Sequence, residues 1–570
     1  MRKLRRILIV VVLLVLALWF LVPKFEPSVE PGSVLVLEIG GTYVEASESP
    51  LLSRLFGDGR RSFVDLLSEL RKAQRDDRLA AVVLRVRNLD VGWGKADEIR
   101  SAVQDLNAAG RRTLAYLEVE SLGANLEYYV ATGAEAIHVA PANRSALVGL
   151  AAEYLFLGGM FQKIGVDLEF ERIGRYKTAT DLFAATGMSE AHREMADALL
   201  DSVNAQFIDG IAAGRKLTPD FVREAIDHAP VTPEEMQSLG LIDGIAYYDQ
   251  IIEELGGGPV ILGSDYAAVD PATVGFDPVA QFALVYGTGM VVTGDGSSTR
   301  SGQPVLASDT VSAALKEAAE DDGISAIIFR IDSPGGSALA SDLVWRATQR
   351  ARESGKPLIA SFSDVAASGG YYVAAGADAI VAPAASLTGS IGVYVLRPVL
   401  RGLLDKLGIG VEGLTRGAHA DLLLASRPLT AETRERLREE IESVYELFVE
   451  RVAAGRDMST ERVDQLGRGR VWTGIQAMES GLIDEVGGLR TAVARAKASL
   501  GLDPDADVSL IAYPQPQSLA EQIDEALRGI AASSAPQLPL PAFARDLLAW
   551  LVAAPEGAPA LLPPFFVEIR

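Results

Sequence analysis

One serine lies in a glycine-rich turn whose residue types suit a nucleophile. Residues 357–362 (PLIASF) predict a buried strand, and residues 363–370 (SDVAASGG) surround Ser368 with small side chains. Small neighbours let a carbonyl group approach the hydroxyl, and Ser368 falls where the next helix should begin. The Ser368 Oγ could therefore attack a carbonyl carbon, with the N–H of Gly369 as one donor to the resulting oxyanion.

A second glycine-rich turn could supply another oxyanion donor. Residues 332–337 (DSPGGS) follow the buried strand predicted at residues 326–331. A Pro-Gly-Gly turn between a strand and a helix can present backbone N–H groups to an anion. The alternative is that both glycine-rich turns serve the fold alone and carry no chemistry.

A serine hydroxyl needs a proton acceptor near neutral pH. The chain has no cysteine, and its histidines are scattered, with no pair at the spacing of helical metal ligands: His138, His192, His228 and His419. Lysine is the remaining strong base, and residues 171–180 (ERIGRYKTAT) place Lys177 in a loop after a predicted strand. Most lysines are solvated surface residues, so spacing alone does not single out Lys177.

The body of the chain contains an internal sequence duplication. Residues 63–88 align without gaps on residues 308–333, and each copy predicts an amphipathic helix, an acidic turn and a buried strand. Later segments also match, including YYVA at 128–131 and 371–374 and GLID at 240–243 and 481–484. The near-continuous apolar strands predict parallel βαβ units, and hence two homologous α/β domains in tandem.

The two copies differ at the positions that could do chemistry. The first copy has residues 89–91 (LDV) where the second has residues 334–336 (PGG). Opposite Ser368 it has Gly123 or Asn125, depending on where a two-residue gap falls. One copy therefore keeps the fold without these turns, which favours chemistry over a purely structural role.

The lysine shows the opposite asymmetry. Lys177 occurs in the first copy, and the aligned position of the second copy is Ala420. A nucleophile present only in one copy and a base present only in the other predict a composite site at the interface between the halves.

The chain begins with a predicted membrane anchor. Residues 7–22 are an unbroken apolar run preceded by Arg2, Lys3, Arg5 and Arg6. This run covers most of a bilayer core, and basic flanks favour the cytoplasmic side, so the body should lie outside the cytoplasm. A cleaved signal peptide is the alternative, but residues 20–23 (FLVP) lack its small-x-small cleavage site.

Charge and the C-terminal segment add two expectations. The net charge of −23 makes nucleic acid an improbable partner. Residues 547–554 and 558–567 are apolar but contain or adjoin prolines, which forbid one continuous spanning helix. We expect this tail to pack on the body or on a neighbouring subunit rather than on a membrane surface.

The predicted organisation has five parts. They are 1–31 for a cytoplasmic stub, transmembrane anchor and linker; 32–262 for the domain that carries the lysine; 263–278 for a linker; 279–505 for the domain that carries the serine; and 506–570 for an apolar tail.

Five short motifs in order resemble the long form of the bacterial signal peptide peptidase A (protease IV) family. They are RYKT at 175–178, DSPGG at 332–336, AASGGYY at 366–372, LTGSIG at 387–392 and GRVWTG at 469–474. The resemblance covers roughly residues 2–502, and the chain after about Asp503 matches no family pattern.

This resemblance implies a crotonase-like, ClpP-type α/β fold and a membrane-anchored serine endopeptidase that degrades cleaved signal peptides and other short hydrophobic peptides. It implies Ser368 as the acylated nucleophile, Lys177 as general base, and Gly369 and Gly336 as the oxyanion hole. Ser390 would orient the lysine amine, although it could also be an ordinary turn hydroxyl. No cofactor or metal is implied.

The resemblance also implies a homotetramer on the outer face of the cytoplasmic (inner) membrane, crossed once by the anchor. Two other classes stay open. A coenzyme A-thioester enzyme of the crotonase fold would need a carboxylate acid/base instead of a Ser-Lys pair. A non-catalytic membrane scaffold would keep the assembly and lose the activity.

Overall fold

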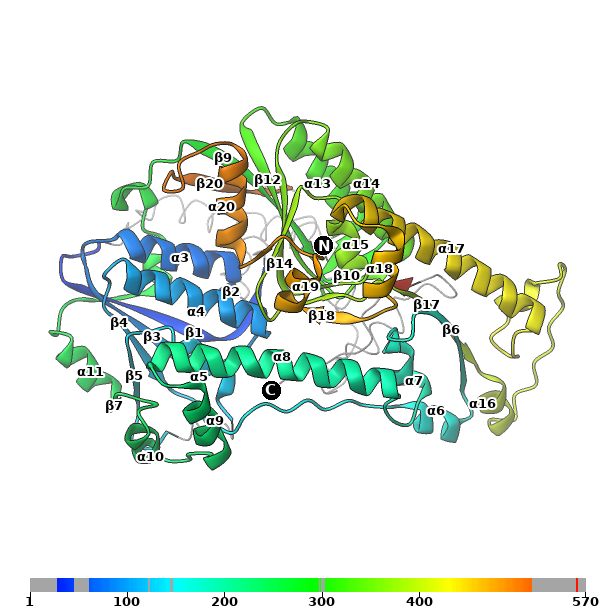
Figure 1. Cartoon of the computed structure of the whole chain (residues 1–570), viewed down its shortest axis with the longest axis horizontal. Helices are drawn as coiled ribbons and strands as arrows, with labels where there is room; N and C mark the ends of the chain where they lie inside the picture. Colours follow the sequence, from blue (N-terminus) through cyan, green and yellow to red (C-terminus); the bar gives the residue numbers. More distant parts are fainter. Residues whose placement is uncertain are drawn as a thin grey trace, which may run out of the picture.

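The computed structural model describes residues 28–45, 61–120, 123–143, 147–296, 298 and 303–514, together with the strand at 560–561. Two parallel sheets side by side, each with helices against it, dominate the described chain (Figure 1). The α/β architecture with parallel units that the sequence predicts is confirmed.

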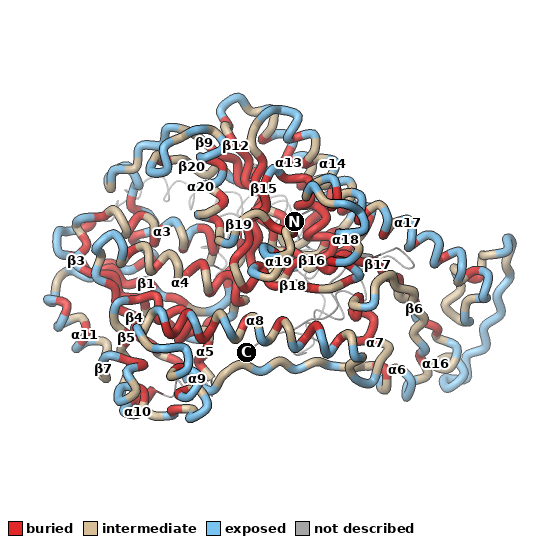
Figure 2. Tube along the Cα trace, in the orientation of Figure 1, coloured by how far each residue is buried: buried red, intermediate tan, exposed pale blue. Residues whose placement is uncertain are grey.

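The first sheet is parallel throughout, in the order β2-β1-β3-β4-β5-β7, with β8 added beside β1. Its strands are β1 (Ser33–Val44), β2 (Arg61–Ser62), β3 (Leu79–Asp90), β4 (Thr113–Leu117), β5 (Ala136–Val139), β7 (Gly244–Ile245) and β8 (Val260–Leu262). The inner strands are buried on both faces, as apolar runs in a parallel sheet require (Figure 2).

The helices of this half cover the sheet or extend from it. They are α3 (Phe63–Arg75), α4 (Trp93–Ala108), α5 (Asn125–Ala131), α6 (Gly158–Ile164), α7 (Asp181–Ala184), α8 (Glu190–Arg215), α9 (Pro219–His228), α10 (Pro233–Ser238) and α11 (Tyr248–Glu254), with the 3₁₀ turn η1 (Thr178–Thr180).

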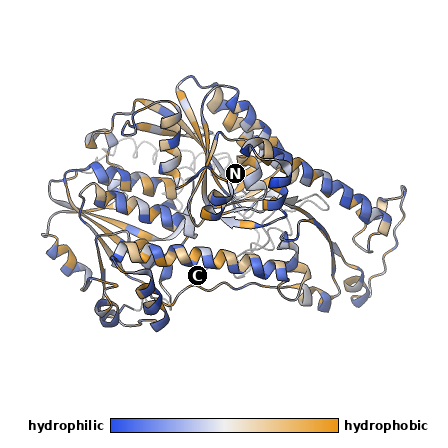
Figure 3. Cartoon of the chain, viewed as in Figure 1, coloured by the Kyte–Doolittle hydropathy of each residue, from blue (hydrophilic) through white to orange (hydrophobic). Residues whose placement is uncertain are grey.

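The second sheet repeats this plan in the order β18-β16-β14-β12-β9-β20, with β15 bridging β14 and β19. Its strands are β9 (Ala280–Thr288), β12 (Ile324–Ser333), β14 (Leu358–Ala367), β15 (Ala379–Ala382), β16 (Leu387–Gly389), β18 (Val471–Thr473), β19 (Glu485–Val486) and β20 (Val508–Tyr513). All pairs are parallel except β16 with β18. The central strands are predominantly apolar, as Figure 3 shows.

The helices of the second half match those of the first. They are α13 (Ser308–Glu320), α14 (Ala338–Arg352), α15 (Gly369–Ala374), α16 (Arg401–Lys406), α17 (Ala431–Arg456), α18 (Thr460–Leu466), α19 (Gly474–Ser480) and α20 (Leu489–Ser499), with the 3₁₀ turn η3 (Ala420–Leu423). The long helices α8 and α17 are equivalent, and each has 26 residues.

Equivalent hydrogen bonds show that the duplication extends to buried contacts. Tyr128 Oη donates to Leu241 O at 2.6 Å, and Tyr371 Oη donates to Leu482 O at 2.7 Å. A register that preserves such a bond aligns Asn125 with Ser368, since each lies three residues before its tyrosine. Asn125, and not Gly123, is therefore the counterpart of the serine.

A third sheet joins the two halves, in the order β11-β10-β13-β21-β17-β6. Its strands are β6 (Asp167–Ile173), β10 (Met290–Val292), β11 (Val305–Ala307), β13 (Gly336–Ser337), β17 (Val393–Val399) and β21 (Ala560–Leu561). β6 comes from the first half and pairs antiparallel with β17 of the second half, from Val393↔Ile173 to Val399↔Asp167. The halves therefore share main-chain hydrogen bonds.

Two predicted boundaries need correction. β20 lies inside the stretch assigned to the tail from residue 506, but it pairs parallel with β9 and belongs to the second sheet. The linker 263–278 contains α12 (Gly263–Tyr266) and η2 (Pro271–Val274), and Lys72 Nζ donates to Tyr266 O at 2.8 Å. These residues therefore pack on the first domain, where Lys72 of α3 supplies a donor to a buried backbone oxygen of α12.

The predicted strand at residues 357–362 is also too short. β14 continues to Ala367, where Val365 to Ala367 pair with Leu387 to Gly389 of β16. Tertiary pairing extends the strand to the residue before Ser368.

The predicted anchor at residues 7–22 lies outside the described residues, and no helix among the described ones has the length and apolarity needed to cross a bilayer.

Candidate active site

Ser368 sits at the sharp junction between β14 and α15. Its backbone has φ 55° and ψ −116°, and its side chain is fully buried. The Ser368 N–H donates to Gly389 O at 2.8 Å, and Tyr372 N–H donates to Ser368 O at 2.8 Å. These bonds hold a conformation that non-glycine residues adopt at a cost of about 1–3 kcal/mol, which is typical of a nucleophile on a strand-to-helix turn.

Lys177 reaches the same place from the other half of the chain. It follows β6 shortly after that strand ends, so the β6–β17 pairing carries it to the second domain. The backbone next to it is fixed there, since Tyr176 N–H donates to Arg468 O at 2.9 Å. The Lys177 side chain is fully buried.

The structure brings these two side chains into direct contact. Lys177 Nζ lies 2.7 Å from Ser368 Oγ, 2.9 Å from Ser390 O and 3.0 Å from Ser390 Oγ. Burial lowers the pKa of Lys177 well below its usual value. An ammonium buried without a counter-charge costs several kcal/mol, so burial shifts the equilibrium of this amine toward its neutral form.

Ser390 follows β16 and contacts the lysine amine from the second half of the chain. Its backbone also has a positive φ, 53°, and its N–H donates to Arg470 O at 2.7 Å. Both its carbonyl and its hydroxyl face Lys177 Nζ, so Ser390 contacts the amine at two points.

The two glycine-rich turns meet beside the serine. A Cβ placed on Gly369 would lie 3.1 Å from the backbone N of Gly336, so these two amides are neighbours. The Ser333 hydroxyl holds the Pro-Gly-Gly turn in place: Gly335 N–H donates to Ser333 Oγ at 3.2 Å, and Ser333 Oγ donates to Gly289 O at 2.6 Å. Gly335 has φ 101°, which requires glycine.

A set of polar contacts that sequence reasoning missed positions the lysine loop. Arg172 Nη1 donates to Lys177 O at 3.2 Å and to Asp181 Oδ1 at 2.7 Å. On α8, Glu194 accepts from Tyr176 Oη at 2.8 Å and from Arg470 Nη1 at 2.7 Å. Glu194 therefore links Tyr176 of the RYKT motif to Arg470 of the GRVWTG motif.

The equivalent place in the first half is filled by its own side chains. Asn125 Nδ2 donates to Gly149 O at 2.8 Å, and Glu127 Oε1 accepts from Leu89 N–H at 2.9 Å. Leu89 aligns with Pro334, which has no N–H, so the hydrogen bond from Leu89 to Glu127 has no counterpart in the second half. The part of the chain that the structure describes has no group of three His, Asp or Glu side chains arranged to hold a metal ion.

Comparison with known proteins identifies the family of the chain. The sequence pattern of peptidase family S49 matches residues 107–257 and 350–503. The protein named "Serine protease SPPA, chloroplastic" of Arabidopsis thaliana is 35% identical over 516 residues, which cover 89% of this chain and 74% of the relative. The chain belongs to peptidase family S49. It is a serine peptidase, and the predicted membership in the signal peptide peptidase A and protease IV family is confirmed.

Two further relatives of this S49 peptidase differ in how much of it they match. "Protease 4" of Haemophilus influenzae is 27% identical over 504 residues, which cover 83% of this chain and 80% of the relative. "Putative signal peptide peptidase SppA" of Enterococcus faecium is 36% identical over 173 residues, covering 30% of this chain and 50% of the relative. These names favour a peptidase over a coenzyme A enzyme or a scaffold.

The lysine loop of the S49 peptidase depends on close backbone contact at Gly174. This residue has φ 108°, and a Cβ there would come within 2.3 Å of the Arg468 carbonyl carbon. We expect Gly174→Ala to displace Lys177 and to lower kcat/KM by about 10- to 100-fold, since small misplacements cost that much. Steady-state peptide hydrolysis measures the effect.

Gly187→Ala is the matched control, because a Cβ at Gly187 would meet no atom within 4 Å. It should leave kcat/KM unchanged. Equal activity of the two variants would contradict the role given to the close contact.

Proposed function

We propose that this S49 peptidase cleaves peptide bonds with a dyad of Ser368 and Lys177, through an acyl-enzyme. The observation that carries the proposal is the 2.7 Å contact between Lys177 Nζ and Ser368 Oγ in a buried site. Burial lowers the pKa of Lys177, which favours the neutral amine that a general base must be.

The contacts of the amine suit this role. A neutral amine has two hydrogens and one lone pair. The two oxygens of Ser390 can accept the hydrogens, at 2.9 and 3.0 Å, which leaves the lone pair for the Ser368 hydroxyl. Ser390 is thus assigned the orienting role.

The reaction then follows in two steps. Ser368 Oγ attacks the peptide carbonyl while its proton passes to Lys177, and protonated Lys177 gives that proton to the leaving amine. Water, deprotonated by the same lysine, then hydrolyses the ester and restores Ser368. The N–H groups of Gly369 and Gly336 are assigned to the oxyanion, each worth about 3–4 kcal/mol.

The third sheet supports a binding mode for the substrate. β21 lies antiparallel between β13 and β17, with Leu561 opposite Gly336 and Ala560 opposite both Ser337 and Tyr394. A strand therefore fits between the two halves, directly beside the oxyanion glycine. We assign this position to extended peptide substrates, which add as a strand through main-chain hydrogen bonds.

The substrate class and the setting are also proposals. The apolar residue types of Ala560 and Leu561 in the strand position and the name of the Enterococcus faecium relative favour cleaved signal peptides and other short hydrophobic peptides. We propose a single-pass protein of the cytoplasmic (inner) membrane, anchored through residues 7–22, with its body on the extracytoplasmic side and four copies assembled together.

The dyad predicts both a loss of activity and a pH dependence. Ser368→Ala and Lys177→Met should each lower kcat by roughly 10²–10⁴-fold or more. Because the base is the neutral amine, kcat/KM of the parent should rise as pH increases through the lowered pKa of Lys177 and fall below it. A pH–rate profile with a hydrophobic peptide measures this.

Lys316→Met is the control, since Lys316 is an exposed lysine on α13. It should keep both the rate and the profile. A flat parent profile between about pH 5 and 10, or an active Lys177→Met variant, would falsify the dyad.

If substrates use the position of β21, the tail competes with them. Removing residues 515–570, or substituting Ala560→Pro to remove a backbone N–H, should lower KM for an extended peptide and leave kcat unchanged. Steady-state kinetics of both variants test this. An unchanged or higher KM would place the substrate elsewhere.

The anchor has a separate test. Deleting residues 1–24 should move the body from the membrane pellet to the supernatant, because it removes the apolar run and its basic flank. Fractionation of cells that express each form measures this, with an alkaline wash to strip peripheral protein. Membrane retention of the shortened form would shift the attachment to another segment.

A further inference from the structure

A buried cluster of charged side chains lies between the halves, apart from the serine and lysine. Lys95, in the first turn of α4, is 4% exposed and contacts three carboxylates. Its Nζ lies 2.5 Å from Asp332 Oδ2, 3.0 Å from Asp364 Oδ2 and 3.0 Å from Glu45 Oε1. Lys95 and Glu45 come from the first half, and both aspartates come from the second.

The two aspartates lie on adjacent strands of the second sheet, close to the Pro-Gly-Gly turn and to Ser368. Asp332 is the penultimate residue of β12 and lies two residues before the Pro-Gly-Gly turn, and Asp364 lies in β14, four residues before Ser368. The same Asp332 also accepts from Val365 N–H, at 3.1 Å to Oδ1. One ammonium therefore joins the strand that leads to the oxyanion turn and the strand that leads to the nucleophile.

We propose that Lys95 is a positioning residue for peptide hydrolysis, whose ammonium sets the separation between the Pro-Gly-Gly turn and Ser368. The inference rests on the proposed function, because it assigns a second element to the same site. Lys95 acts through Asp332 and Asp364 and touches neither Ser368 nor Lys177 in the contacts described above.

The backbone around Lys95 is built for close approach to β14. The N–H groups of Gly92 and Lys95 donate to the two Asp364 oxygens at 3.0 and 2.8 Å. A Cβ on Gly92 would come within 2.5 Å of Asp364 Cγ, and a Cβ on Gly94 within 2.7 Å of Ser363 O. The start of α4 therefore docks on the strand with little room to shift.

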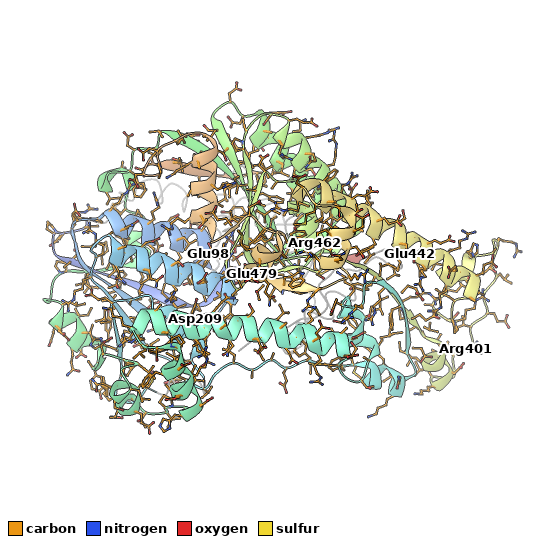
Figure 4. All side chains as sticks on the ribbon, in the orientation of Figure 1. Glu98, Asp209, Arg401, Glu442, Arg462 and Glu479 are labelled. Atoms are coloured by element: carbon orange, nitrogen blue, oxygen red, sulfur yellow. The ribbon has the colours of Figure 1, made fainter. Side chains whose placement is uncertain are left out.

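A second buried cation belongs to the same cluster. Arg330 of β12 is fully buried, and it contacts Glu45 at 2.9 Å and Glu98 at 2.6 Å. Glu45 thus bridges Arg330 and Lys95. Figure 4 labels Glu98 on α4, where that helix faces the strands of the second half.

The charge state of Lys95 suits a clamp and not a base. Burial alone would lower its pKa, but Asp332, Asp364 and Glu45 outweigh burial and raise the pKa well above the usual value. Without the ammonium, three carboxylates would face one another in a buried space, and they would separate or take up protons. Either response releases the constraint on the two strands.

The test compares Lys95→Met, Lys95→Arg and the matched control Lys72→Met. Lys72 is another buried lysine of the first half, and its Nζ donates to backbone oxygens of Tyr266, Ala267 and Val269. For Lys95→Met we expect kcat to fall by about 10- to 100-fold with KM within about twofold, measured on a hydrophobic peptide. Lys95→Arg should recover most of kcat, and Lys72→Met should lower the unfolding temperature but keep kcat.

A purely structural role of Lys95 would lower the folded fraction without changing kcat per site titrated by a fluorophosphonate probe. Normal kcat per titrated site in Lys95→Met would therefore overturn the inference. If Lys95→Met does not fold, Asp332→Asn replaces it, because that change keeps the size of the side chain and removes one charge of the clamp. Normal kcat in Asp332→Asn would overturn the inference equally.

The proposed dyad fails separately, through an active Lys177→Met variant or a flat pH–rate profile. Those results do not depend on Lys95. The double variant Lys95→Met/Asp332→Asn should be about as active as the less active of the two single variants, since both changes remove the same contact. Additive losses would contradict action through Asp332.

Discussion

The site depends on a lysine amine that is buried without a counter-charge among its described contacts. Lys177 Nζ contacts only hydroxyl and carbonyl oxygens in those contacts, and burial lowers its pKa. Lys95, also buried and also from the first half, faces three carboxylates and has a raised pKa. The charge around each side chain therefore shifts the pKa of two buried lysines in opposite directions, which suits the proposed base and the proposed clamp respectively.

Each half of the chain supplies what the other lacks. The first half contributes β6, Lys177 and Lys95 to the interface, and the second contributes Ser368 and the glycine turns. The first half has Leu89, Asp90 and Val91 in place of the Pro-Gly-Gly turn, and Glu127 accepts from Leu89 N–H there. Duplication thus permitted two copies of one fold to become two parts of one site.

Much of this arrangement could be predicted from the sequence. Apolar runs gave the parallel strands, the internal alignment gave the two halves, and the motifs gave Ser368 and Lys177 as candidates. The sequence could not give the β6–β17 pairing, because strand partners distant in sequence leave no local pattern. Lys95 was missed for the same reason, since its partners lie 237 and 269 residues away.

The backbone at the nucleophile restricts which side chain can stand there. With φ 55° and ψ −116°, position 368 strongly disfavours a branched Cβ, because a second substituent would crowd the adjacent peptide groups. Threonine carries the same hydroxyl as serine but also this branch. Among the two alcohol side chains of similar size, the turn itself selects the unbranched one, before any contact with a substrate is made.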